Sequence, residues 1–106
     1  MSFESLRRLS CPHCAAPSDL LVLFDRLGAA WRAGPWVEVT CPRCDRPAVL
    51  ELEGEDVAIG FVRSTPRATF EPRERVRQPG LRLSPTPDGI LLELLHRRWV
   101  VERTRH

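Results

Sequence analysis

The clearest hydrophobic pattern in the chain is an alternation of apolar and polar residues between positions 37 and 62. Residues 37–40 and 48–53 alternate, and residues 57–62 form an apolar run after the turn-forming sequence Gly54-Glu55-Asp56. A period of two is typical of a half-buried strand, and two runs around such a turn predict a β-hairpin. The register makes three apolar side chains candidates for the covered face: Val49, Ile59 and Phe61.

Residues 18–33 carry a helical pattern. Ser18-Asp19 is a suitable helix start and Gly34-Pro35 a suitable stop, and apolar residues recur at helical spacing between them: Leu20, Leu23, Phe24, Leu27 and Trp31. The uninterrupted apolar run 20–24 is equally typical of a buried strand followed by a loop. We expect a helix over this segment, with the strand as the alternative.

The end of the chain, residues 88–106, is predicted to form an amphipathic helix. Thr86 suits the N-cap and Pro87 the first helical position. The apolar stripe of this helix would consist of Ile90, Leu91, Leu94, Leu95 and Trp99. Gly89 and the β-branched pair Val100-Val101 favour a final strand instead, which is the alternative. The stripe needs a covering partner, which is the rest of the chain, a second copy or another protein.

Residues 63–87, which we call the arginine arm, are predicted to be an extended linker. The arm holds half of the chain's ten prolines and few large apolar side chains. Its six arginines against two acids give +4, whereas residues 48–62 before it hold four acids and no base. Five arginines of the arm are candidate binding residues: Arg63, Arg67, Arg73, Arg75 and Arg77. The alternative is that the arm folds back onto the acidic hairpin.

All four cysteines lie in two copies of one motif, Cys11-Pro12-His13-Cys14 and Cys41-Pro42-Arg43-Cys44. Two residues between cysteines let one tight turn aim both sulfurs at the same point, and four thiolates at ~2.3 Å suit a structural zinc ion. The motif therefore predicts one structural Zn²⁺ held by four ligands: Cys11, Cys14, Cys41 and Cys44. Four thiolates close the coordination sphere, so such a zinc cannot activate water.

The net charge of a zinc tetrathiolate would be −2, which backbone N–H groups and nearby cations must offset. Arg43 and Arg46 flank the second motif and His13 lies inside the first, and we expect charge compensation or simple exposure for all three. Two disulfides are the competing use of four cysteines. The N-terminal residues show no export signal and no apolar run approaches membrane-spanning length, so we expect a soluble, cytoplasmic protein with reduced thiols.

Two Cys-Pro-x-Cys loops, the second entered from an alternating strand and followed by a hairpin, resemble the zinc-ribbon family over residues 8–62. The resemblance implies a single structural zinc on the four cysteines. The fold expected is α+β, with a zinc ribbon at 1–62, the arginine arm at 63–87 and a C-terminal helix at 88–106. Because zinc ribbons serve in transcription, translation, nucleic-acid binding and protein docking, the resemblance does not fix a role.

The cysteine pattern also resembles that of the rubredoxin family, whose members hold one iron for electron transfer. Ala15 and Asp45 stand where that family has glycine, and the chain lacks the tyrosine of its aromatic core. We therefore prefer zinc, with iron and electron transfer as an alternative.

The sequence favours a binding function over an enzymatic one. It contains no glycine-rich phosphate loop, no His-Glu-x-x-His and no evident nucleophile and base pair, and it suggests no small-molecule substrate. A rigid zinc-held platform, the arginine arm and the C-terminal stripe are parts of a docking module, which predicts an adaptor or regulatory subunit with a protein partner or self-association. Nucleic-acid binding through the arginine arm is the alternative.

Overall fold

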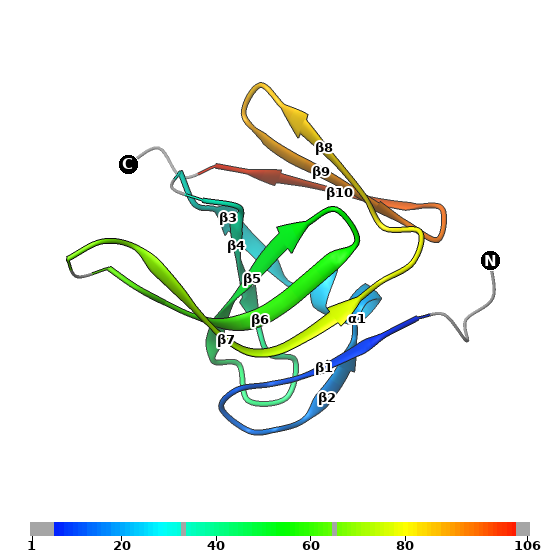
Figure 1. Cartoon of the computed structure of the whole chain (residues 1–106). Helices are drawn as coiled ribbons and strands as arrows, with labels where there is room; N and C mark the ends of the chain where they lie inside the picture. Colours follow the sequence, from blue (N-terminus) through cyan, green and yellow to red (C-terminus); the bar gives the residue numbers. More distant parts are fainter. Residues whose placement is uncertain (1–5, 33, 65, 104–106) are drawn as a thin grey trace.

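The computed structural model describes residues 6–32, 34–64 and 66–103, which are built almost entirely from antiparallel strands (Figure 1). The described elements are, in order, β1 (Arg8–Ser10), β2 (Pro17–Asp19), α1 (Leu20–Phe24), β3 (Leu27–Ala30), β4 (Trp36–Thr40), β5 (Pro47–Glu53), β6 (Asp56–Arg63), β7 (Thr69–Arg77), β8 (Arg82–Thr86), β9 (Gly89–Leu94) and β10 (Arg97–Glu102). They form sheets ordered β1-β2, β3-β4-β5-β6-β7 and β10-β9-β8. The expected α+β class is therefore wrong, because the described chain is nearly all β.

The β5–β6 hairpin confirms the alternation predicted between residues 48 and 62. Leu50 pairs with Ile59 and Glu53 with Asp56 across the turn at Gly54, whose φ of 58° suits glycine. Ile59 pairs with Leu50 and is buried in the main core, whereas Val49, the neighbour of Leu50 in β5, is buried on the other face of the sheet. The expectation that Val49 and Ile59 share one covered face is therefore wrong. The third candidate, Phe61, is half-buried and contacts His13.

The helix expected over residues 18–33 is wrong for the described residues 18–32 except for one short piece; residue 33 lies outside the described residues. The helix begins after Asp19, within the expected start Ser18-Asp19, and the Asp19 side chain caps it by accepting a hydrogen bond from the Val22 amide at 2.9 Å. The helix ends at Phe24, and the chain then enters β3, which pairs with β4. Pairing with the neighbouring strand therefore overrides the helical spacing at Leu27 and beyond.

The expected C-terminal helix is wrong, because β9 and β10 form a hairpin; residues 104–106 lie outside the described residues. Leu95 and His96 make its two-residue turn with φ of 50° and 64°, a geometry that matches the twist of antiparallel strands. Burial follows a period of two, since Leu92 and Leu94 are both at most 1% exposed. Leu92 lay outside the expected helical stripe.

The arginine arm is also paired rather than an isolated linker. Its first part contains β7, which is hydrogen-bonded to β6 along its length with a bulge near Gly60. Its last residues form β8, which pairs with β9, and Pro87 and Asp88 make the turn that was expected to start a helix. Proline is tolerated here because β7 and β8 are both terminal strands of their sheets.

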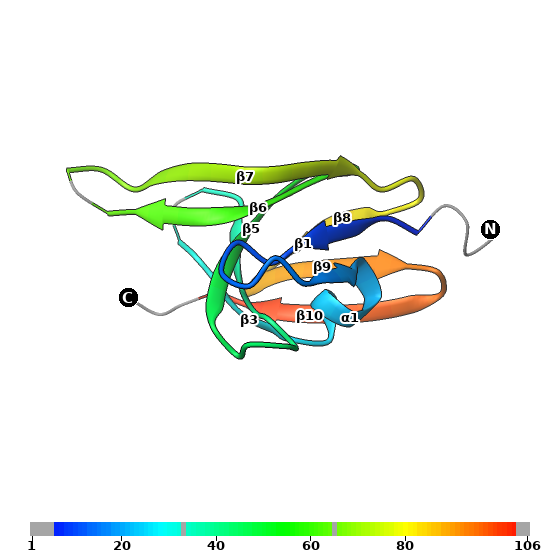
Figure 2. The ribbon, with the colours of Figure 1, turned by 90° about the horizontal axis from the view of Figure 1, so that it is seen from below.

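The sheets enclose one core between two layers, with β6 and β7 on one side and β9 and β10 on the other (Figure 2). The layers meet where β10 approaches β3, through a parallel bridge between Ala30 and Arg103. At the opposite edge β1 lies against β7, and the Arg7 amide donates a 2.8 Å hydrogen bond to Oε1 of Gln78, a fully buried residue. Among the described residues, no helix combines the length and the apolar character that a membrane span requires.

Candidate metal centre

The two cysteine motifs are the loops of two β-hairpins. The first connects β1 to β2 and the second connects β4 to β5. Their backbones repeat the same hydrogen bonds: the Cys11 carbonyl accepts from the Ala15 amide at 2.8 Å, and the Cys41 carbonyl accepts from the Asp45 amide at 3.0 Å. Each strand pair therefore holds one half of the cysteine cluster in the same local conformation.

Ala15 and Asp45 hold the left-handed conformation that follows each motif, with φ of 63° and 58°. This is the position at which the rubredoxin family has glycine, for which the conformation carries no steric penalty. Aspartate tolerates it better than most residues, whereas alanine is strained by about 1 kcal/mol. Both loops therefore adopt this conformation without glycine. The absence of glycine at Ala15 and Asp45 is thus a weaker argument against an iron site than we expected from the sequence.

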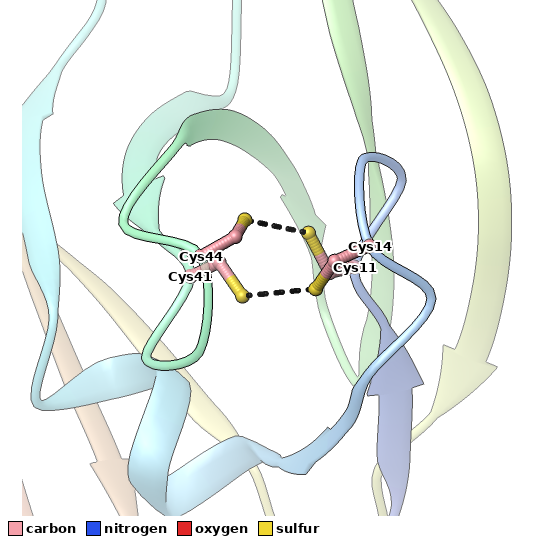
Figure 3. Close-up of side chains that lie close together, drawn as sticks. All are labelled: Cys11, Cys14, Cys41 and Cys44. Carbon is pink, nitrogen blue, oxygen red and sulfur yellow. Dashed lines mark hydrogen bonds between the residues drawn. The ribbon is translucent and has the colours of Figure 1, made fainter.

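The four sulfur atoms face one another across the gap between the loops (Figure 3). The Sγ atoms of Cys11 and Cys44 lie 3.8 Å apart and those of Cys14 and Cys41 lie 3.7 Å apart, and all four lie within 4.8 Å of one another. Tetrahedral ligands at ~2.3 Å from a zinc ion would be separated by ~3.8 Å. The thiol cluster thus has the dimensions of a tetrahedral metal site, and all four cysteines are free in this structure.

Burial differs between the two cysteines of each loop. Cys11 and Cys41, which leave strands β1 and β4, are 7% and 5% exposed, whereas Cys14 is exposed and Cys44 half-buried. The buried pair anchors the cluster on the core beside Leu9 and Val39, which are fully buried. A metal bound here would tie both hairpin loops to that core.

Backbone amides favour thiolates at the cluster. The His13 amide donates to Cys11 Sγ and the Arg43 amide to Cys41 Sγ, both at 3.3 Å. Burial opposes ionisation of Cys41, but the backbone N–H groups of Cys44 and Arg43 together with the neighbouring thiols lower its pKa to about 6.

Cys44 shows the opposite shift. The Arg46 backbone N–H favours its thiolate, but burial and the other thiols outweigh this donor and raise the Cys44 pKa to about 11. One cysteine of the cluster therefore ionises easily, but each further thiolate is repelled by the negative charge already present. A bound cation is needed to keep all four cysteines as thiolates.

The polar residues beside the cysteines act as neighbours rather than ligands. The His13 ring lies 3.0 Å from the Pro47 carbonyl through Nε2 and packs edge-on against Phe61 at 5.0 Å, which holds it in contacts with the protein. Arg43 and Arg46 are exposed. The Asp45 carboxylate, which follows Cys44 in the second loop, forms an ion pair with Arg26.

Most of the predicted binding residues of the arginine arm are engaged within the chain. Arg63 pairs with Glu71, Arg75 with Glu51 and Arg77 with Glu55, and Arg73 lies 5.6 Å over the Phe61 ring. These partners include two acids of the β5–β6 hairpin, as in the alternative in which the arm folds back. Arg67, in the β6–β7 connection, is exposed and forms no ion pair with another described residue.

The C-terminal apolar residues also find partners inside the molecule. Leu94 is 1% exposed, and Leu91 and Leu95 are half-buried. Trp99 packs edge-on against Phe24 at 5.2 Å, and its Nε1 donates to Asp25 Oδ1 at 2.8 Å. The stripe expected to need a partner is thus largely covered by the chain itself.

Two connecting residues were not predicted from the sequence. Asp25 accepts from both Arg97, at 2.6 Å, and Trp99, and these hydrogen bonds lower its pKa below the usual value. Glu55 accepts from the Gly80 amide at 2.8 Å and from Arg77, and these two donors lower its pKa. Neither role has a local signal, because each partner lies far away along the chain.

Comparison with known proteins adds no family name. No protein-family model matches the chain, and neither a curated protein nor a solved structure matches it. The cysteine cluster and its surroundings are therefore the basis for assigning a function.

Proposed function

We propose that this chain is a non-enzymatic metalloprotein in which one structural Zn²⁺ supports a protein-binding surface. The observation that carries the proposal is the cluster of four cysteine sulfurs with the spacing of a tetrahedral site. Thiolate ligands need reduced cysteines, which a reducing compartment maintains, so the proposal includes the cytoplasm as the location. In this proposal the chain serves as an adaptor or a regulatory subunit.

A structural rather than catalytic role follows from the ligand set. Four thiolates leave no open position for water or substrate, whereas catalytic zinc sites keep one. The nearest imidazole, His13, is held by Pro47 and Phe61. The zinc-ribbon resemblance is compatible with this proposal, since the two cysteine loops sit on hairpins, although the sheets around them extend far beyond a ribbon.

The alternative metal is iron, in a rubredoxin-like electron carrier. The positive φ at Ala15 and Asp45 supports it, because those loops have the conformation that the rubredoxin glycines would favour. Metal analysis with a visible spectrum of the purified protein tests this point, since an iron tetrathiolate is coloured and a zinc tetrathiolate is colourless. A red protein with stoichiometric iron would overturn the zinc proposal.

The alternative partner is nucleic acid, bound through the arginine arm. Exposed Arg67 supports it, but the ion pairs of Arg63, Arg75 and Arg77 reduce the charge that the arm can offer to phosphate. Binding to single-stranded RNA measured at several salt concentrations tests this alternative, because phosphate contacts weaken steeply with salt. Absence of binding, or binding independent of salt, would remove it.

Removal of the metal tests the structural role directly. Structural zinc in small folds contributes apparent binding free energies of order 10 kcal/mol, so a strong chelator should abolish the cooperative unfolding transition or lower its midpoint sharply. The matched control is the same titration after zinc is restored in excess. An unfolding curve that the chelator leaves unchanged would contradict a structural metal.

A further inference from the structure

The sheet formed by β8, β9 and β10 packs on the core through one face. Leu92 and Val101 belong to the core, so the alternation of side chains along a strand turns Leu91 and Val100 to the opposite face, which we call the outward face. Figure 1 shows this sheet at the edge of the molecule, with the five-stranded sheet on one side of it. Val100 is 71% exposed, more than any other large apolar side chain among the described residues.

Cross-strand pairing arranges the outward face in three rows. The middle row consists of Ser84, Leu91 and Val100. The row nearer the β9–β10 turn consists of Arg82, Glu93 and Arg98. The row nearer the β8–β9 turn consists of Thr86, Gly89 and Glu102. A partly apolar row therefore lies between a row with a net charge of +1 and a row with a net charge of −1.

The basic row has more positive charge than its one carboxylate can balance. Glu93 Oε2 lies 3.5 Å from Arg98 Nε, and the Arg98 side chain is 73% exposed, so this contact contributes little. Arg82 is exposed and forms no hydrogen bond or ion pair with another described residue. Both arginines line a hollow of about 610 Å³ on the surface, where a carboxylate of a partner can reach them.

The acidic row has the opposite character. Glu102 is exposed and forms no ion pair with another described residue. Asp88, in the β8–β9 turn beside this row, is also exposed and adds a second negative charge. The neighbouring cation, Arg103, is directed towards the end of β3, since its Nη1 donates to the Trp31 carbonyl at 3.0 Å. The two ends of the outward face therefore differ in sign.

We propose that a second copy of this chain docks on the outward face, related to the first by a two-fold axis along the middle row. Arg98 and Glu102 are each two residues from Val100 on one strand. Such an axis therefore places Arg98 of each copy over Glu102 of the other, and Val100 over Val100, as in an isologous dimer. A purely acidic or purely basic peptide would be repelled at one end of the face. The inference rests on the proposed protein-binding function and names its surface and its partner.

The size of the face predicts a weak and reversible dimer. Strands of five or six residues, three strands wide, present roughly 300 Å² per copy, whereas a standard interface buries about 800 Å² per partner. We therefore expect a dissociation constant on the order of 100 μM, with the two Arg98–Glu102 pairs fixing the orientation. Because these pairs are exposed at the rim, association should weaken as the salt concentration rises.

The test is sedimentation equilibrium of the zinc-loaded full chain over about 10 μM to 1 mM, a range that brackets this affinity. The test variants are Arg98→Glu and Glu102→Arg, each alone and mixed in equal amounts. In either variant alone, like charges meet twice across the axis, whereas in the mixed dimer both pairs are again of opposite sign. The matched controls are Arg67→Glu and Glu53→Arg, which make the same charge changes at exposed positions outside the outward face.

The average mass of the wild-type chain should rise with concentration towards that of a dimer. Each test variant alone should associate at least about tenfold more weakly, while their mixture returns to within about threefold of the wild type. The controls should stay within about twofold. Val100→Lys should also weaken association about tenfold, since two lysines meet at the axis, whereas Val22→Lys on α1 should not. Zinc content and unfolding midpoints verify that each variant is folded.

A wild-type chain that remains monomeric at about 1 mM would refute the dimer. So would test variants that associate as strongly as the wild type, or a mixture that associates no better than its components. Growth beyond the dimer would also contradict the two-fold axis, because an isologous contact closes after two copies. Any of these results leaves a structural zinc and a different protein partner possible, whereas unfolding that a chelator does not change counts against the metal-supported platform itself.

Discussion

Truncation of neighbouring leucines on β9 tests the C-terminal hairpin most sharply. Leu92 is fully buried and belongs to the core, whereas Leu91 is half-buried on the opposite face of the strand. A helix with the stripe expected from the sequence would bury Leu91 and place Leu92 outside that stripe. A helix predicts the larger loss of stability for Leu91→Ala, whereas the hairpin predicts it for Leu92→Ala.

The magnitudes follow from burial. Removal of a fully buried leucine side chain costs about 2–5 kcal/mol, because the transfer free energy is lost and a cavity remains. A domain of this size is stable by only about 5–15 kcal/mol, so Leu92→Ala removes a large share of that stability. Leu91 lies opposite Val100, which is 71% exposed, so Leu91→Ala should cost less than about 1.5 kcal/mol.

Urea unfolding followed by circular dichroism, with zinc present in excess, measures both variants. Zinc content is checked in each, so that a change in stability is not a change in metal binding. The hairpin predicts a much lower midpoint for Leu92→Ala than for Leu91→Ala, with similar slopes. Equal losses, or a larger loss for Leu91→Ala, would refute the assignment of β9.

Two further variants test other parts of the fold. Gly89→Ala should destabilise the chain by at least about 2 kcal/mol in urea, because an added Cβ would lie 1.8 Å from the Val101 carbonyl oxygen; a wild-type midpoint would contradict this close approach. Asp25 has a lowered pKa in the folded state, so its carboxylate stabilises the protein above its unfolded pKa near 3.8, and this stability is lost as the pH falls through the lower folded value. Asp25→Asn should therefore flatten the loss of stability below pH 3.8, measured by thermal unfolding across pH, and an unchanged acid limb would show that the bonds to Arg97 and Trp99 contribute nothing.

The metal ligands could be predicted from the sequence because the signal is local. Each pair of cysteines sits in one tight turn, and the strand pairs around the turns need only bring two such loops together. The β5–β6 hairpin was predictable for the same reason, since alternation and a glycine turn lie within a short stretch. The order of the strands in the sheets had no such signal.

A final strand was only the alternative for the end of the chain, on Gly89 and Val100-Val101, and the hairpin itself was not predicted because its turn lacks the usual residues. Leu95 and His96 take positive φ without a glycine or asparagine, so no turn signal interrupted the helical spacing of Leu91, Leu94 and Leu95. Similarly, the prolines of the arginine arm suggested an unpaired segment, but terminal strands of a sheet accept proline. Long-range pairing decided both cases.

A pocket between the cysteine loops also could not be predicted from the sequence. Arg8 and Arg43 are 35 positions apart in the chain, and they line one pocket only because β1 and β4 place the two loops face to face. The arginine-rich segment that attracted attention in the sequence is instead largely neutralised by Glu51, Glu55 and Glu71. The number of arginines in a segment was thus a poor guide to the charge that the segment presents in the folded chain.

A cobalt titration of the metal-free chain, followed by visible absorption, tests the central claim most directly. Co²⁺ in a tetrahedral thiolate site absorbs strongly in the visible range, whereas Co²⁺ bound by water is nearly colourless. We predict saturation at one Co²⁺ per chain, displacement by Zn²⁺, and recovery of cooperative unfolding in step with binding. Cys44→Ser should weaken the signal and the binding. A pale spectrum typical of oxygen ligands, or folding that does not depend on the metal, would contradict the account.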